Sequence, residues 1–247
     1  MSRIVSLLVA VACYAIFFAT FLYLICFVGD LSFAPLTVDR GGIEGPIALA
    51  LIVNVALIAI FGLQHSVMAR QGFKRAWTRI VPAHLERSAF VLAASVALIV
   101  LFLFWRPMPG VVWEIGNPLL ANLMWALFWI GWATVLVSTF LINHFELFGL
   151  QQAWFNARGR EAAPPTLRQP MLYKWVAHPL YAGFFLAFWA TPQMTVGHLL
   201  LAVGMSVYML IAIRYEERDL VGLFGDDYVK YRSSVGMLLP RFRKRSA

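Results

Sequence analysis

Charged residues are scarce in this sequence. Asp, Glu, Lys and Arg make up only 13% of its 247 residues, whereas hydrophobic residues make up 61%. A soluble domain of this length needs considerably more polar surface. The apolar residues also form continuous runs and lack the period-two alternation of strands in a membrane barrel. The composition therefore predicts an all-α, polytopic integral membrane protein.

Cysteine is almost absent. The two cysteines, Cys13 and Cys26, both lie in the first apolar run. On a single helix they are too far apart to form a disulfide bond. We therefore expect no disulfide framework and interpret both as small apolar residues.

The motifs of common cofactor sites are missing as well. Clustered histidine boxes and His or Cys pairs at metal-ligand spacing do not occur, so we expect no metal. Nucleotide-binding folds are disfavoured because neither G-x-G-x-x-G nor a P-loop is present. A haem between helices would need paired histidines at bilayer depth, whereas the histidines here lie at the ends of apolar runs.

What the sequence does contain is six apolar segments. Four have about the 20 residues that a membrane span needs, and the last two are shorter. Pro192 and Gly197 separate these last two and predict a hairpin. We expect a single membrane domain over residues 1–247. The segments in chain order are 4–28, 46–68, 88–105, 119–142, 179–191 and 197–213.

Lysine and arginine are distributed very unevenly between the loops. With six crossings, 18 of the 20 lie on one side and 2 on the other, whereas five crossings would put the basic tail on the wrong side. We therefore expect six crossings of a bacterial-type inner membrane, with both termini in the cytoplasm. The net charge of +8 is then explained by topology and by membrane lipid, so nucleic acid is not expected as a partner.

Three features outside the apolar segments carry local predictions. Pro164, Pro165 and Pro170 predict an extended stretch in the loop after the fourth segment. Gly225 is expected to interrupt an amphipathic helix in the C-terminal tail. The basic end, residues 241–245, is expected to lie against anionic lipid.

Three of the five histidines gather at the predicted cytoplasmic edge. His65 ends the second apolar segment, His144 follows the fourth and His178 precedes the fifth. Polar groups at such an edge are expected to be functional. The remaining two, His84 and His198, are interpreted as ordinary structural residues.

The His178-Pro179 pair predicts the start of a helix, because proline is tolerated in the first helical turn. The free amides at such a start favour an anion. Tyr181 and Gly183 follow within one or two turns and offer an aromatic face and room for a ligand near the backbone. The alternative is helix capping combined with anchoring at the membrane interface.

Two acidic residues, Glu216 and Glu217, are expected at the end of the sixth apolar segment. Acids at a helix C-terminus oppose the helix dipole, so a positive group should compensate them. A ligand with a sulfonium and an ammonium group would suit carboxylates and aromatic faces. The alternative is a solvated helix end with ion pairs to Arg214 and Arg218.

The C-terminal third carries a resemblance to a known family. The pattern H-P-x-Y-x-G at 178–183, then E-E-x-x-L-x-x-x-F-G-x-x-Y-x-x-Y at 216–231 and Pro240, resembles the isoprenylcysteine carboxyl methyltransferase superfamily. Its members are integral-membrane enzymes that use S-adenosyl-L-methionine. The resemblance implies that residues 143–247 form the cofactor-binding part. The implied cofactor contacts are His178, Pro179, Tyr181, Gly183, Glu216, Glu217 and Tyr228.

One position departs from the family pattern. The family usually has an arginine before the His-Pro pair, and this sequence has Ala177 there. The residue that makes one cofactor or substrate contact is therefore not identified by the family pattern. Arg168, Lys174 and Arg214 are the candidates to replace it.

A second stretch, N-H-F-E-L-F-G-L-Q-Q at 143–152, together with Gln64-His65-Ser66, resembles the nurim-like branch of the superfamily. The resemblance implies methyl transfer to a small thiol, such as methanethiol to dimethyl sulfide, with hydrogen sulfide left open as an acceptor.

A thiol with a pKa of about 8.5 is mostly protonated at neutral pH, so a base is needed. His144 and His65 are the candidate bases. The expected catalytic residues are His144, His65 and Glu146, and the expected substrate contacts are Asn143, Gln64 and Arg214.

Two other functions stay open. A prenylated cysteine carboxylate as acceptor would need a lipid-sized groove and an arginine for the carboxylate, which Ala177 does not supply. A non-catalytic nurim-like membrane protein is the second alternative, and it would bind no S-adenosylmethionine. The oligomeric state is left open.

Overall fold

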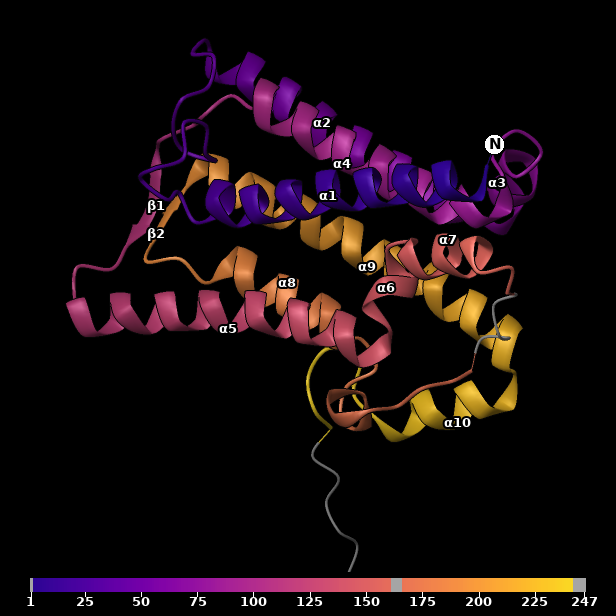
Figure 1. The fold of residues 1–247 in the computed structure, drawn as a ribbon. Helices are drawn as coiled ribbons and strands as arrows, with labels where there is room; N and C mark the ends of the chain where they lie inside the picture. Colours follow the sequence, from indigo (N-terminus) through magenta and orange to yellow (C-terminus); the bar gives the residue numbers. More distant parts are fainter. Residues whose placement is uncertain (1, 161–165, 242–247) are drawn as a thin grey trace, which may run out of the picture.

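The computed structural model describes residues 2–160 and 166–241, and Pro164, Pro165 and most of the basic end lie outside them. Among the described residues, five helices are long and apolar enough to cross a membrane. They lie roughly along one direction and connect the two ends of the molecule (Figure 1). The protein is therefore a mostly helical membrane protein. The five are α1 (Arg3–Val28), α2 (Ile47–Ala69), α4 (Glu86–Phe104), α5 (Pro118–Ile142) and α9 (Val196–Phe224).

Short helices gather at one end of the long ones. Figure 1 shows α3, α6, α7 and α10 at the end that also holds the N-terminus. Their apolar side chains pack on the long helices, as Ala153 of α7 does beside Ala10 of α1. The short elements are α3 (Gln71–Trp77), η1 (Ala83–Leu85), α6 (His144–Leu147), α7 (Leu150–Ala157), η2 (Met171–Lys174) and α10 (Asp226–Ser234).

The opposite end carries a small antiparallel sheet of β1 (Val111–Glu114) and β2 (Gln193–Thr195) (Figure 1). Val111 pairs with Thr195 and Glu114 with Gln193, with an irregularity between Val111 and Trp113. The all-α prediction missed these strands, because three or four residues are too few to produce a periodic signal. The loop before α2 is tied to the sheet, since the Thr195 hydroxyl donates to Asp39.

The fifth apolar segment forms a short helix, α8 (Pro179–Trp189). Its 11 residues span about 16 Å, roughly half the thickness of a bilayer core. It starts at Pro179 with His178 as the N-cap, as predicted. It packs very closely against α5. The close approach is seen at Gly183, where a β-carbon would lie 2.8 Å from the Gly131 carbonyl oxygen.

The sixth apolar segment belongs to a longer helix than the hydropathy suggests. Helix α9 continues to Phe224, so Glu216 and Glu217 lie inside it. The expectation that they end the helix and oppose its dipole is wrong, since the polar residues after Ile213 keep the helix conformation. Gly225, with φ +56°, separates α9 from α10, and the predicted interruption is confirmed.

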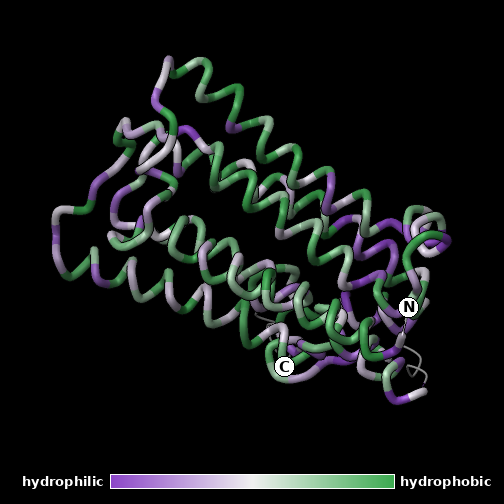
Figure 2. Tube along the Cα trace, turned by 45° about the horizontal axis from the view of Figure 1, so that its top comes forward, coloured by the Kyte–Doolittle hydropathy of each residue, from purple (hydrophilic) through white to green (hydrophobic). Residues whose placement is uncertain are grey.

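The distribution of side chains agrees with a membrane setting. The core is aromatic and tightly buried, with Phe27, Trp105, Phe128 and Phe188 nearly inaccessible. Large apolar side chains also cover the outside of the long helices; Ile52, for example, is 66% exposed. Figure 2 shows hydrophobic residues along these helices and hydrophilic ones toward the two ends.

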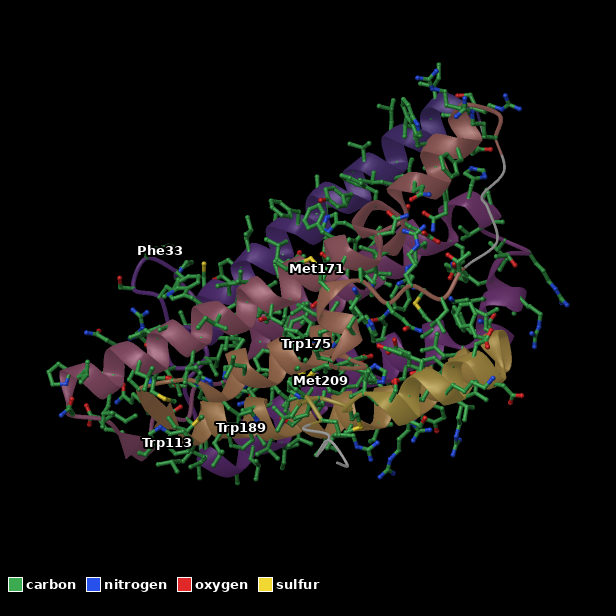
Figure 3. All side chains as sticks on the ribbon, turned by 90° about the horizontal axis from the view of Figure 1, so that it is seen from below. Phe33, Trp113, Met171, Trp175, Trp189 and Met209 are labelled. Atoms are coloured by element: carbon green, nitrogen blue, oxygen red, sulfur yellow. The ribbon has the colours of Figure 1, made fainter. Side chains whose placement is uncertain are left out.

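Exposed aromatic residues are also found near the ends of the helices. In Figure 3, the exposed Phe33 lies at the sheet end, and Trp175, directly after η2, lies nearer the middle of the view. The Trp175 side chain is 65% exposed. Aromatic residues at such positions are typical of a membrane–water interface.

Candidate active site

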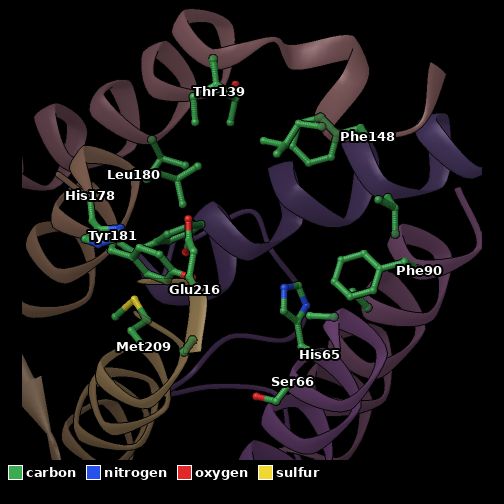
Figure 4. Close-up of a pocket in the computed structure, with 18 of the residues that line it drawn as sticks. His65, Ser66, Phe90, Thr139, Phe148, His178, Leu180, Tyr181, Met209 and Glu216 are labelled. Carbon is green, nitrogen blue, oxygen red and sulfur yellow. The ribbon is translucent and has the colours of Figure 1, made fainter. Parts of the chain in front are cut away.

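A cavity of about 560 Å³ lies among α1, α2, α4, α5, α8 and α9 (Figure 4). Its volume is in the range of about 300–1,000 Å³ that is usual for small-molecule sites. Most of the wall is apolar, and the polar groups belong to the ends of the helices nearest α3 and α6. The aromatic part of the wall includes Phe17, Phe21, Phe61, Phe90, Phe184 and Phe188.

The cavity brings together five of the residues that the sequence singled out. His65 of α2, His144 of α6, His178 before α8, Tyr181 of α8 and Glu216 of α9 all line it. Figure 4 shows His65 across the cavity from Tyr181 and Glu216. The predicted gathering of three histidines at one end is therefore confirmed.

His144 is held by hydrogen bonds at both ring nitrogens. Its Nδ1 lies 2.8 Å from the Thr139 hydroxyl, which itself donates to the Leu136 carbonyl oxygen. Nδ1 must therefore carry the proton, and Nε2 accepts the Tyr14 hydroxyl at 2.7 Å. The ring also stacks on Phe140 at a centroid distance of 4.2 Å. Burial lowers the pKa of His144, so the ring is neutral at pH 7.

His65 is different, because its Nδ1 is buried and has no hydrogen-bond partner among the described residues. The ring contacts Phe90 at a centroid distance of 4.7 Å and faces Phe61 and Tyr208. In Figure 4 it is directed into the cavity. Of the two candidate bases, only His144 has hydrogen bonds at both ring nitrogens, and His65 has none among the described residues.

His178 begins a chain of polar contacts that joins three elements. Its Nε2 lies 3.4 Å from Oε1 of Glu217, and the same oxygen lies 3.1 Å from Nε of Arg232 on α10. Glu217 is buried and does not line the cavity. Arg232 is thus a positive partner of Glu217, and the sequence did not identify it.

Several other residues that the sequence singled out do not line the cavity. Asn143 caps α6 by accepting from the Glu146 amide, and its side-chain amide donates to the Glu146 carboxylate at 2.8 Å. Tyr228 is buried in a cluster below Ala177, and Gln64 donates to the Met68 sulfur. Their functional roles stay predictions. The predicted residues outside the lining are Pro179, Gly183, Glu217, Tyr228, Glu146, Asn143, Gln64 and Arg214.

The three candidates to replace the family arginine also lie outside the lining. Arg168 donates to the Ile142 carbonyl oxygen, and Lys174 and Arg214 are exposed. Ala177 itself does line the cavity. An arginine at that position would therefore have been next to the ligand space.

Three basic residues that do line the cavity were missed by sequence reasoning: Arg70, Lys74 and Arg87. Arg70 lies 3.7 Å from the carboxylate of Asp219. Burial, with Arg87 nearby, lowers the pKa of Lys74. In the sequence these three look like ordinary loop charges. For Arg87 the sequence does offer one indication of a role at the membrane edge, because it stands directly before a long apolar run.

The fold and the cavity together define an α-helical integral membrane protein with a small-molecule site near one end of its helices. The chain is 52% identical over 240 residues to methanethiol S-methyltransferase of Mycobacterium tuberculosis, covering 97% of this chain and 98% of that protein. It is 45% identical over 246 residues to methanethiol S-methyltransferase of Crocosphaera subtropica, covering 100% and 96%. The chain belongs to the methanethiol S-methyltransferase family.

A more distant likeness agrees with the predicted branch. Nurim of Danio rerio is 28% identical over 189 residues, covering 71% of this chain and 66% of nurim. This supports the nurim-like resemblance read from residues 143–152. No family model and no solved structure matches the chain.

Proposed function

We propose that this protein transfers a methyl group from S-adenosylmethionine to methanethiol and releases dimethyl sulfide. The observation that carries the proposal is the apolar cavity in which the His65 ring faces Glu216 and Tyr181. The name shared by relatives at 45–52% identity points to the same reaction.

The polar lining of the cavity fits S-adenosylmethionine. Glu216 and Asp219 offer carboxylates for its ammonium group and ribose hydroxyls, and Lys74 offers a cation for its carboxylate. Tyr181 and His178 offer aromatic faces for the base and the sulfonium. The bound cofactor supplies a methyl group made electrophilic by the sulfonium charge. In this proposal residues 143–247 supply most contacts, and α3 adds Lys74.

We assign deprotonation of the thiol to the His65 ring, which is directed into the cavity, because a general base must lie within reach of the proton that it takes. His144 has no free ring nitrogen, since Thr139 and Tyr14 occupy both. His144 is therefore a positioning residue at the junction of α5 and α1. The apolar wall favours neutralisation of charge between a thiolate and a sulfonium.

We further propose six crossings of a bacterial inner membrane, with both termini and the polar end of the cavity on the cytoplasmic side. The positive-inside rule supports this orientation. The path of the chain agrees, because α8 and the segment after it lead from the cavity to β2 at the opposite end (Figure 1).

The test is conversion of methanethiol to dimethyl sulfide by the purified protein with S-adenosylmethionine, measured in the headspace. His65→Gln should lower the rate about 10²- to 10⁴-fold, because it removes the base. Binding of S-adenosylhomocysteine, measured by calorimetry, should persist in this variant. His84→Gln is the matched control, since His84 contacts Ser6 and does not line the cavity.

Other outcomes would replace the proposal. Cofactor binding with methylation only of a prenylated cysteine would favour the carboxyl methyltransferase alternative. Absence of binding at millimolar cofactor would favour a non-catalytic nurim-like protein. Full activity of His65→Gln at every pH would remove His65 from the role of base.

A further inference from the structure

Arg87 is a cation in the cavity wall without a carboxylate partner. It lies in the first turn of α4, where its Nε donates to the Leu147 carbonyl oxygen at 2.7 Å. Its guanidinium carbon lies 4.9 Å from the centre of the Phe90 ring. Within the part of the chain that the structure describes, it makes no ion pair within 4 Å. A charge in an apolar wall is costly unless an opposite charge compensates it.

Arg87 and His65 pack on the same aromatic ring. The His65 ring lies 4.7 Å from Phe90, and the Arg87 guanidinium lies 4.9 Å from it. Both residues line the cavity. The His65 ring and the Arg87 guanidinium therefore border the same region of the cavity.

The other two cations of the wall have different surroundings. Arg70 pairs with Asp219 and lies 4.4 Å over the Tyr215 ring. Lys74 belongs to the short helix α3 at the polar end of the molecule. Arg87 is the cation that directly adjoins the aromatic wall.

We propose that Arg87 stabilises the thiolate form of the substrate, an inference that rests on the proposed thiol methylation. An apolar cavity disfavours a thiolate, whereas a cation a few ångströms away favours it. The substrate anion in turn compensates the charge of Arg87. The ligand recognised is a small anionic sulfur species.

The proton and electron balance of the step is simple. The His65 imidazole takes the proton of the thiol, which leaves a thiolate beside Arg87. The thiolate sulfur forms a bond to the methyl carbon as the bond from that carbon to the sulfonium sulfur breaks. The electron pair of the broken bond stays on the departing sulfur, which gives S-adenosylhomocysteine and the methylated thioether. His65 then returns its proton to water.

The inference is tested by the ionisation of a bound thiol in the absence of turnover. Thiophenol is titrated against pH in the protein saturated with S-adenosylhomocysteine, and its thiolate is followed by near-ultraviolet absorbance. In Arg87→Gln the ratio of bound thiolate to bound thiol at a fixed pH should fall about 10- to 100-fold. Arg87→Lys keeps the charge and should stay within about threefold of the unaltered protein.

Other titrating groups face this region and must be considered in the pH curves. They lie on six different elements and are common to all three proteins compared, so differences between variants isolate Arg87. These groups are His65, Lys74, Glu86, Glu146, Tyr181 and Glu216.

Each result decides between specific alternatives. An unchanged thiolate ratio in Arg87→Gln overturns the inference while leaving the proposed function intact. Weaker binding of S-adenosylhomocysteine with unchanged thiol ionisation makes Arg87 a cofactor contact and overturns it as well. If the unaltered protein binds no S-adenosylhomocysteine, the proposed function fails, and the inference fails with it.

A measurement on the unaltered protein covers the case in which Arg87→Gln does not fold. Bound thiophenol should then be more ionised at a given pH than thiophenol dissolved in empty detergent micelles. Lower ionisation in the protein than in micelles overturns the inference.

Discussion

At the scale of single residues, hydrogen bonding separates the two histidines that could act as base. His144 and His65 both follow apolar runs and both line the cavity. His144 binds Thr139 and Tyr14, whereas Nδ1 of His65 has no partner among the described residues. The first arrangement holds the His144 ring in place, and the second leaves the His65 ring without a hydrogen bond.

The hydrogen bonds of His144 predict a pH-dependent contribution to stability. Burial lowers the pKa of His144, so the folded state favours the neutral ring. The contribution of neutral His144 to stability is fully present above the pKa of about 6.5 that the residue has in the unfolded chain. It is lost as pH falls through the lower pKa that the residue has in the folded protein. The loss of thermal midpoint caused by His144→Gln in detergent should therefore shrink between pH 7 and pH 5. A loss that is the same at both pH values would contradict this.

At the scale of elements, the contact between α5 and α8 positions one wall of the cavity. Gly131 and Gly183 let the two helices approach so closely that each lacks room for a β-carbon. Helix α8 carries Tyr181 and starts at His178. The contact between the two backbones thus sets the position of α8 and of the cavity residues on it, although neither glycine lines the cavity.

This contact predicts a cost for a single added methyl group. In Gly183→Ala the new β-carbon would meet Gly131 and Val135 backbone atoms at 2.8 Å, so α8 must shift. We expect a loss of about 1–3 kcal/mol in stability, which is typical of overpacking, and weaker binding of S-adenosylhomocysteine. Calorimetry measures both.

The matched control is Gly222→Ala in α9. Gly222 has nothing within 4 Å of an added β-carbon. This variant should be neutral or slightly more stable, because alanine is the better helix former by about 0.5–1 kcal/mol. Equal effects of the two substitutions would show that the α5–α8 approach is not the cause.

At the scale of the whole molecule, the two ends differ in chemistry. The end with α3, α6 and α10 holds the polar part of the cavity (Figure 1). The opposite end is closed by the two strands and by the loop that contains Asp30, Thr37, Asp39 and Arg40. Arg40 pairs with Asp30 at 2.7 Å, and Thr37 also donates to Asp30.

The closed end predicts a second pH effect, opposite in sign to that of His144. Burial, despite the hydrogen bond from Thr195, raises the pKa of Asp39 to about 6. The folded state therefore favours the protonated acid. The stabilising contribution of protonated Asp39 is fully present below pH 4 and is lost as pH rises through about 6. Asp39→Asn should be more stable than the unaltered protein by about 1–2 kcal/mol at pH 7.5.

Thermal unfolding in detergent at several pH values measures this difference. The advantage of Asp39→Asn should disappear near pH 4, where the carboxyl group of the unaltered protein is protonated. An advantage that does not change with pH would contradict the role of Asp39 ionisation.

Hydropathy, charge and short motifs were enough to predict a helical membrane protein of the nurim-like branch, with its polar groups at one end. They also located the start of α8 at Pro179 and the break at Gly225. These properties are readable because they depend on a residue and its near neighbours along the chain. Helix α9 was underestimated, since its last turns are polar yet stay helical.

The tertiary structure alone decided which histidine is free and which cations border the cavity. His144 meets Tyr14 from 130 positions away, and Arg87 reaches Leu147 from 60. Such contacts depend on how helices distant in sequence pack. For that reason the role of Arg70, Lys74 and Arg87 in the wall of this cavity could not be predicted from the sequence.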